Sequence, residues 1–215
     1  MSNLKGEFLD ICVRNKILCF GEFTLKSGRS SPYFFNAGLF NTGELLGQLA
    51  KFYALLISAE LKNDFMLYGP AYKGIPLATA IAVQLANHQK RNVAYAFNRK
   101  ETKDHGEGGN IVGAALNGDV VIVDDVITAG TSINESVKII KSAGAKPCAI
   151  AIALDRQEIA DGDTHSAVQK IEQQYNVPVL SLLKLDDLVN YLQSTQEYRQ
   201  YYDAVAAYRD AYGSN

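Results

Sequence analysis

Residues 119–140 place two acids and a hydroxyl-rich turn between an apolar run and a helical pattern. The sequence is DVVIVDDVITAGTSINESVKII, in which four β-forming residues lead into Asp124 and Asp125. The hydroxyl-rich turn that follows is Thr128, Ala129, Gly130, Thr131 and Ser132, and Val126 and Ile127 connect the acids to it within the same expected binding segment. Such a turn can close around a phosphate, and the helix N-terminus behind it stabilises the phosphate by up to about 2 kcal/mol. The two acids would then face a ribose on the same ligand.

A helix cap is the alternative interpretation of this string, because acids and a Thr-Gly turn also cap helices. Here the apolar run, both acids, the turn and the helical pattern occur in register, which favours the phosphate site. The chain has neither a Walker lysine motif nor a dinucleotide GxGxxG, so the two commoner phosphate loops are excluded.

A second turn between an apolar run and a helical pattern carries a lysine. Residues 68–74, YGPAYKG, precede a helix that we expect to begin near Pro76. The backbone of this turn and Lys73 can meet a second anionic group. Gly-Pro and Lys-Gly are also common in turns that have no functional role, so an ordinary turn is the alternative here.

Residues 99–110, RKETKDHGEGGN, combine basic side chains with glycines and have no apolar residue to anchor them. We expect this segment to be mobile without ligand and to close over an anion as a lid. Its basic side chains are Arg99, Lys100, Lys103 and His105. A solvated hairpin tip of mixed charge is the alternative.

From residue 65 onwards, short apolar runs alternate with helical patterns, which predicts the sheet that positions these turns. The apolar runs are 65–68, 120–123, 148–154 and 177–183, and the helical patterns are 75–88, 133–144, 165–175 and 186–193. This alternation predicts an α/β fold with a central, mainly parallel sheet flanked by helices. Ligands bind at the carboxyl edge of such a sheet. The runs 94–97 and 111–114 predict a hairpin beside it.

The two ends of the chain follow other patterns. Helical spacing predicts helices over 2–18 and 43–61, and the aromatic segment 21–38 between them reads as irregular. Near the other end, tyrosines recur at helical spacing, which predicts a helix with core or dimer packing. These are Tyr198, Tyr201, Tyr202, Tyr208 and Tyr212. We expect one domain over 1–215, with helices and a hood segment in 1–60 and the core with its lid in 61–215.

Composition narrows the possible classes of function. The chain has 215 residues, 47% of them hydrophobic and 20% charged, which is ordinary for a globular protein. A formal net charge of −2 argues against nucleic acid or an acidic membrane as partner. Three scattered cysteines argue against a disulfide framework or a zinc site. The N-terminus does not resemble a signal peptide, so we expect a soluble, cytoplasmic, reduced protein.

The string 119–140 resembles the phosphoribosyl pyrophosphate signature of the type I phosphoribosyltransferases. In that family the acids hold the ribose hydroxyls and the turn holds the 5-phosphate. The resemblance extends through FGEFTLKSGRSSPYFFNAG (20–38), GPAYKGIPLA (69–78), FNRKETKDHGEGGNIVG (97–113) and LDRQE (154–158). Together these segments resemble the orotate phosphoribosyltransferase branch of the family. The resemblance implies transfer of ribose 5-phosphate from phosphoribosyl pyrophosphate to orotate, which yields orotidine 5′-phosphate for UMP biosynthesis.

The resemblance also implies roles for single residues. Tyr72 and Lys73 grip pyrophosphate, and a non-proline cis peptide is expected between Ala71 and Tyr72. Phosphoribosyl pyrophosphate is further contacted by Lys26, Arg99, Lys103 and His105. Orotate is contacted by Phe34, Phe35 and Arg156, although an Asp155–Arg156–Glu158 surface ion-pair cluster is the alternative for the arginine. Lys100 reaches the active site of the neighbouring subunit, which implies a homodimer.

The implied reaction needs no side-chain nucleophile, because the base nitrogen displaces pyrophosphate from C1 of the ribose. The expected catalytic groups therefore position substrates and stabilise the charge on the leaving pyrophosphate. They are Lys73, Arg99, Lys100, Lys103, His105, Asp124 and Asp125. We expect Mg²⁺ to bind mainly through phosphoribosyl pyrophosphate and not at a site made by protein alone.

Two other functions remain open at this point. One is a regulator that senses phosphoribosyl pyrophosphate and binds nucleic acid, although no basic surface or recognition module is evident. The other is a phosphoribosyltransferase for a different base, such as a purine.

Overall fold

The computed structural model describes residues 2–25, 27–103, 109–160 and 162–214. A six-stranded sheet has the order β5-β4-β3-β6-β7-β8. All neighbouring strands are parallel except β4 and β5, which are antiparallel. The strands are β3 (Met66–Gly69), β4 (Tyr95–Lys103), β5 (Gly109–Gly113), β6 (Asp119–Val123), β7 (Lys146–Asp155) and β8 (Val179–Lys184). The mainly parallel sheet and the hairpin at its edge confirm the sequence prediction.

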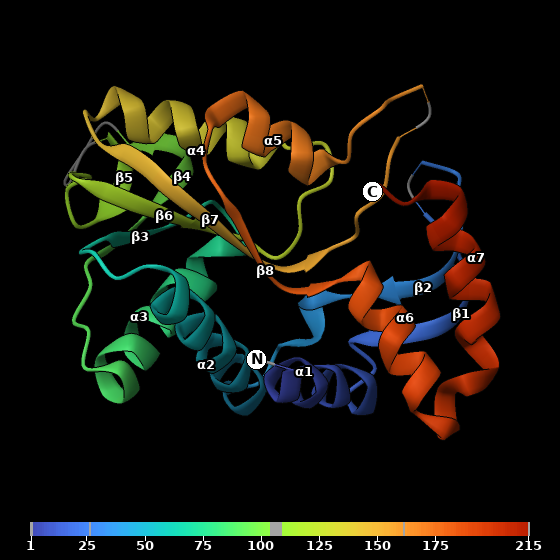
Figure 1. Ribbon diagram of the computed structural model, residues 1–215. Coiled ribbons are helices and arrows are strands. Elements are labelled where there is room, and N and C mark those ends of the chain that lie inside the picture. The colour runs from blue at the N-terminus through green and yellow to red at the C-terminus, as the bar shows by residue number, and fades with distance from the viewer. Residues whose placement is uncertain (1, 26, 104–108, 161, 215) are drawn as a thin grey trace.

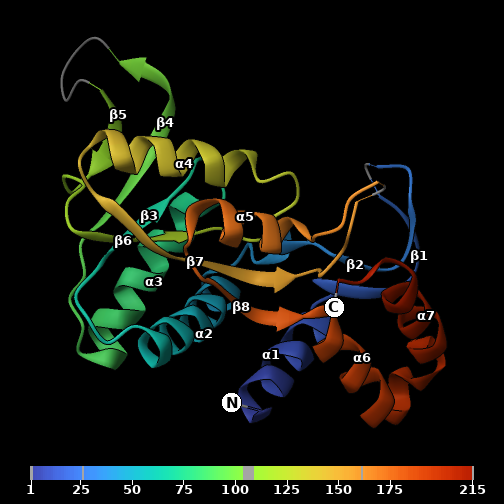
Figure 2. The ribbon, with the colours of Figure 1, turned by 45° about the horizontal axis from the view of Figure 1, so that its top comes forward.

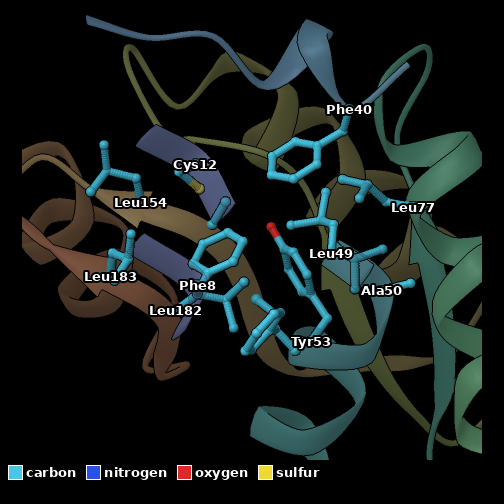
Figure 3. Packing of buried hydrophobic residues seen from close by; sticks show 14 of the residues in the cluster. Phe8, Cys12, Phe40, Leu49, Ala50, Tyr53, Leu77, Leu154, Leu182 and Leu183 are labelled. Carbon is cyan, nitrogen blue, oxygen red and sulfur yellow. The ribbon is translucent and has the colours of Figure 1, made fainter. Parts of the chain in front are cut away.

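Helices cover both faces of this sheet (Figure 1). On one face lie α4 (Thr131–Ser142) and α5 (Ala167–Tyr175), and on the other lie α2 (Gly43–Glu60) and α3 (Gly74–Gln89). Side chains alternate accordingly along β6: Val121 and Val123 join the core cluster of the α2 and α3 face, and Ile122 joins the other. Figure 3 shows the larger cluster, where Phe8 packs near Tyr53 and Leu49.

The helix at the N-terminus is shorter than its pattern predicts. Helix α1 (Ser2–Arg14) ends before residue 18 because Lys16 adopts a positive φ of 56° and Leu18 starts a strand. No helix of the described ranges is long and apolar enough to cross a membrane.

The segment 21–38, expected to be irregular, instead forms most of a two-stranded antiparallel sheet. Strand β1 (Leu18–Thr24) pairs with β2 (Ser30–Phe35), and the 3-10 helix η1 (Ala37–Leu39) follows. The expectation was wrong because Gly21 and Pro32 interrupt the alternation that indicates a strand. A two-stranded sheet has only edge strands, and these tolerate proline and irregular pairing. The pairing register does shift between Phe20 and Phe23.

The tyrosine-rich segment is divided between two kinds of helix, so the expectation of one regular helix was also wrong. Helix α6 (Leu185–Ser194) leads into the 3-10 helix η2 (Gln196–Tyr201) and then α7 (Tyr202–Tyr212). The expected packing is present within the chain: Tyr208 is buried, and the Tyr201 ring stacks 5.7 Å from Phe20. The 3-10 helix η2 and helix α7 thus lie against the β1–β2 sheet, and α7 is seen beside this sheet in Figure 1.

Candidate functional site

The two turns singled out in the sequence lie side by side at the carboxyl edge of the sheet. They follow β3 and β6, which are neighbouring parallel strands, so both chains leave the sheet at the same edge. Across the gap between the turns, Lys73 Nζ donates to Asp125 Oδ2 over 2.6 Å. The arrangement therefore joins a cation from one turn to the acid pair of the other.

Asp124 sits in a buried, hydrogen-bonded position. Its side chain accepts from the backbone N–H of Asp125 over 2.9 Å and from Ser132 Oγ over 3.0 Å. Burial, reinforced by the neighbouring charge of Asp125, raises the Asp124 pKa from 3.8 to about 6. The Tyr53 hydroxyl donates to the Asp124 carbonyl over 2.7 Å and so ties helix α2 to this turn.

The turn after the acids presents the start of α4 without a side-chain cap. Gly130 precedes the helix with a left-handed φ of 72°, and the described residues supply no side-chain hydrogen bond to cap this end. A Cβ at Gly130 would lie 3.1 Å from Ile171 Cδ1, so the position also has little room for a larger residue. Uncapped N–H groups at a helix start can bind a phosphate, whereas the capping interpretation requires a side-chain acceptor.

The 69–74 turn is held tightly at both ends. A Cβ at Gly69 would lie 2.0 Å from the carbonyl oxygen of Gly74, so only glycine allows this close approach. The peptide between Ala71 and Tyr72 is cis, as expected from the family resemblance. The Ala71 N–H donates to Asn98 Oδ1 of β4 over 2.9 Å.

A cavity of about 230 Å³ separates the 69–74 turn from the first turns of α4. Its lining includes Pro70, Ala71, Asn98, Lys100 and Thr131. Lys100 Nζ also lies 5.0 Å from the centroid of the exposed Tyr72 ring. The cavity thus lies beside the β4–β5 hairpin, whose strand β4 extends beyond α4 in Figure 2.

The residues expected at the base come from the β1–β2 sheet and the end of β7. Phe34 is exposed and stacks with Phe23 at 5.6 Å, whereas Phe35 packs against the core. Neighbouring side chains on a strand point to opposite faces, so the two rings do not form one surface. Arg156 follows β7 and pairs with Glu158 over 2.7 Å, with only 18% and 15% of the two side chains exposed. The Arg156–Glu158 pair forms, but it is not a surface pair, and the Asp155 side chain accepts from the backbone of Gln157.

Other expected site residues fall outside what the structure describes. These are Lys26 and His105, together with the side chain of Lys103 and the middle of the lid segment, 104–108. Arg99 is half-buried on β4. Among the described residues, no group of three or more histidine, cysteine, aspartate or glutamate side chains could hold a metal ion.

Sequence reasoning assigned no site role to three side chains that hold the site together. Asn98 supports the 69–74 turn, Tyr53 supports Asp124, and Tyr33 donates to Glu158 over 2.9 Å. The one available signal was Asn98, a polar residue at the end of the apolar run 94–97. The two tyrosines read as ordinary core residues, because their partners lie far away in the chain.

Comparison with known proteins shows the family of the chain. Residues 41–180 match the family model described as "Phosphoribosyl transferase domain". An orotate phosphoribosyltransferase of Thioalkalivibrio sulfidiphilus is 55% identical over 213 residues, covering 99% of this chain and all of the relative. One from Janthinobacterium is 56% identical over 221 residues, covering 99% of each chain.

The solved structures include a similar fold. The crystal structure of the Francisella tularensis orotate phosphoribosyltransferase has a TM-score of 0.87 and 44% identity, and the match covers 97% of this chain and all of that one. The similarity therefore includes the hood, the sheet and the C-terminal helices. The chain belongs to the orotate phosphoribosyltransferase family of the phosphoribosyltransferases.

Proposed function

We propose that the chain carries out the reaction of its family at the carboxyl edge of β3 and β6. That reaction transfers ribose 5-phosphate from phosphoribosyl pyrophosphate to orotate, giving orotidine 5′-phosphate and pyrophosphate in pyrimidine biosynthesis. One observation supports this position of the active site. Lys73 Nζ and Asp125 Oδ2, from two separate turns, lie 2.6 Å apart beside the start of α4, which has no side-chain cap among the described residues.

In this assignment the β6 turn binds the 5-phosphoribosyl group. The backbone and hydroxyls of 126–132 hold the 5-phosphate, supported by the free N–H groups at the start of α4. Asp124 and Asp125 accept from the ribose hydroxyls. The fixed hydrogen bonds of Asp124 to Ser132 and to the Asp125 backbone support this role, because they hold the carboxylate in place before ligand arrives.

The leaving pyrophosphate lies against the 69–74 turn. Tyr72 and Lys73 contact it from this turn. Arg99, Lys103 and His105 add positive charge from the lid of the same chain, and Lys100 adds it from the lid of the neighbouring subunit. These groups stabilise the charge that develops as the C1–oxygen bond breaks and the base nitrogen approaches from the other face. No side-chain nucleophile takes part. Lys73 must exchange its bond with Asp125 for one with the phosphate, and its exposure makes that exchange inexpensive.

Orotate binds between the hood and the end of β7. Phe34 offers an exposed ring to the pyrimidine, Phe35 supports the strand from behind, and the Arg156 guanidinium pairs with the carboxylate. Lys26, from the hood segment, contacts phosphoribosyl pyrophosphate and not orotate. A site that holds this carboxylate discriminates against uracil, because uracil cannot make the charge-assisted hydrogen bonds to Arg156, which contribute about 1.5–3 kcal/mol.

Asp124 and Asp125 would hold Mg²⁺ through its water molecules, and the ion would supply positive charge to the phosphate oxygens of phosphoribosyl pyrophosphate. The fit is supported by the two acids at the site, which can orient water molecules of a hydrated ion, and magnesium usually keeps several waters.

A homodimer with Lys100 acting in the neighbouring subunit's site completes the assignment. Its support is the family resemblance and the exposure of Lys100, which leaves the side chain accessible to a second copy. The whole chain, 1–215, acts as one domain, with a hood in 1–60, a core in 61–215 and a lid at 99–110. A cytoplasmic location accords with the free thiols of Cys12, Cys19 and Cys148.

The test is product formation from phosphoribosyl pyrophosphate and each of four bases, orotate, uracil, adenine and hypoxanthine, with Mg²⁺ and after its removal by chelation. We expect orotate to exceed uracil in kcat/KM by at least about tenfold, with no product after chelation. Equal turnover of orotate and uracil would contradict the assignment of the base site. Turnover of a purine in place of orotate would contradict the function itself.

A further inference from the structure

Arg156 is held by a small network of side chains from distant parts of the chain. Its Nε and Nη2 donate to the same oxygen of Glu158, Oε1, over 3.0 and 2.7 Å. The Tyr33 hydroxyl donates to that oxygen over 2.9 Å, and the guanidinium carbon lies 5.1 Å from the centroid of the Tyr33 ring. One carboxylate oxygen thus receives three donors, and the aromatic ring covers the face of the cation.

This network uses the edge of the Arg156 guanidinium that carries Nε and Nη2, and it does not use Nη1. The hydrogens on Nη1 have no partner among the described residues, so they remain available to a ligand carboxylate. A guanidinium without the Glu158 contact would rotate about its long side chain. The fixed plane therefore decides where a carboxylate must lie to receive a two-bond contact.

The network also fixes the two halves of the base site relative to each other. Tyr33 precedes Phe34 on β2, while Glu158 follows Arg156 after β7. The backbone beside Glu158 is itself anchored, because the Ile159 N–H donates to the Tyr212 carbonyl over 2.8 Å. Tyr33 is fully buried, so its hydroxyl bond is protected from water and ties the hood strand to the Arg156 segment.

The geometry points to Glu158 and Tyr33 as positioning residues that determine specificity for the carboxylated base. They hold the Arg156 guanidinium with its Nη1 edge open and set its distance from the Phe34 ring. Neither residue touches the reacting atoms. This inference rests on the proposed function, since it requires that Arg156 contact the orotate carboxylate.

A double-mutant cycle on Arg156 and Glu158 tests the inference in the full-length protein. The variants are Arg156→Ala, Glu158→Ala and the double variant, with Glu158→Gln as the matched control that keeps an acceptor oxygen. Kinetics with orotate, uracil and phosphoribosyl pyrophosphate are measured beside thermal unfolding. A milder variant, Tyr33→Phe, removes only the hydroxyl. It replaces Glu158→Ala in the double-mutant cycle with Arg156→Ala if Glu158→Ala does not fold.

We expect Glu158→Ala to lower kcat/KM for orotate by about tenfold, and Tyr33→Phe by about threefold, since each removes a hydrogen bond to a charged network. The KM for phosphoribosyl pyrophosphate and the low activity with uracil should change by less than about twofold. Glu158→Gln should keep most of the wild-type kcat/KM for orotate, because its amide oxygen can still accept hydrogen bonds from Arg156 and Tyr33. In the Arg156→Ala background, neither Glu158→Ala nor Tyr33→Phe should add a further loss.

Two results would overturn the positioning role. The first is multiplication of the Arg156 and Glu158 effects in the double variant, which indicates independent action. The second is an equal loss for uracil and orotate, which indicates general damage to the fold. If Arg156→Ala itself leaves orotate turnover unchanged, the proposed contact of Arg156 with the base fails, and this inference fails with it.

Discussion

Asp124 carries a cost in stability that its replacement by asparagine should remove. Burial beside Asp125 raises its pKa from 3.8 to about 6, so the folded chain binds this proton more tightly than the unfolded chain does. A group of this kind destabilises the fold above the raised pKa, and the penalty fades as the pH falls towards the ordinary value. At neutral pH the penalty is about 3 kcal/mol at most.

Asp124→Asn keeps the shape of the side chain and can keep both hydrogen bonds, since the Ser132 hydroxyl can accept as well as donate. We therefore expect the apo variant to unfold at a higher temperature than wild type at pH 7.5, by about 3 °C or more. The difference should shrink to about a third of this value near pH 4.5 and vanish below the ordinary pKa of the carboxyl. Activity with orotate should fall at the same time, because the ribose loses its charged acceptor.

Thermal unfolding followed by circular dichroism across this pH range is the assay. Asp64→Asn serves as a control for the loss of one negative charge at an exposed position, and it should leave the unfolding temperature unchanged. Unfolding of Asp124→Asn at the same or a lower temperature than wild type at pH 7.5 would contradict this cost of Asp124. An equally large stabilisation at pH 4.5 would contradict its origin in the raised pKa.

Three further outcomes follow from the site. Lys73→Ala should raise the KM for phosphoribosyl pyrophosphate at least about tenfold. It should change the free energy of unfolding by less than about 1 kcal/mol, because the Lys73 side chain is 61% exposed in its pair with Asp125. A large loss of stability would contradict the minor structural role of this pair. Gly69→Ala should lower the free energy of unfolding, measured in urea, by more than about 2 kcal/mol, because its Cβ would lie 2.0 Å from the Gly74 oxygen. Retained stability would contradict this prediction and show that the turn can relax. Co-expressed Lys100→Ala and Asp125→Asn chains should recover about a quarter of wild-type activity in random dimers, and hybrids with no activity above the single variants would exclude Lys100 from the neighbouring site.

The parallel sheet could be predicted from the sequence because its strands are buried on both faces. Such strands read as continuous apolar runs, as 120–123 and 148–154 do, and a helical pattern follows each of them. The hood could not be predicted in the same way. Its strands are short and contain Gly21 and Pro32, so local pattern indicates a loop, and only pairing across the turn makes them strands.

In the candidate site, too, contiguous motifs could be predicted from the sequence, whereas contacts between residues far apart in the chain could not. The acid pair and the two turns could be predicted because each motif is contiguous. The support of Ala71 by Asn98 spans 27 residues, and that of Glu158 by Tyr33 spans 125, so neither leaves a local signature. The Asp124 position likewise depends on a distant element, because the Tyr53 hydroxyl of α2 donates to the Asp124 carbonyl.

The most direct measurement is a crystal structure with phosphoribosyl pyrophosphate and Mg²⁺ bound. We expect the 5-phosphate at residues 128–132 at the start of α4, the ribose hydroxyls on Asp124 and Asp125, and the pyrophosphate against Tyr72 and Lys73. Lys73 should then have left Asp125 for a phosphate oxygen. A complex with the 5-phosphate and pyrophosphate in exchanged positions, or with the ligand away from the turns after β3 and β6, would contradict the proposed site.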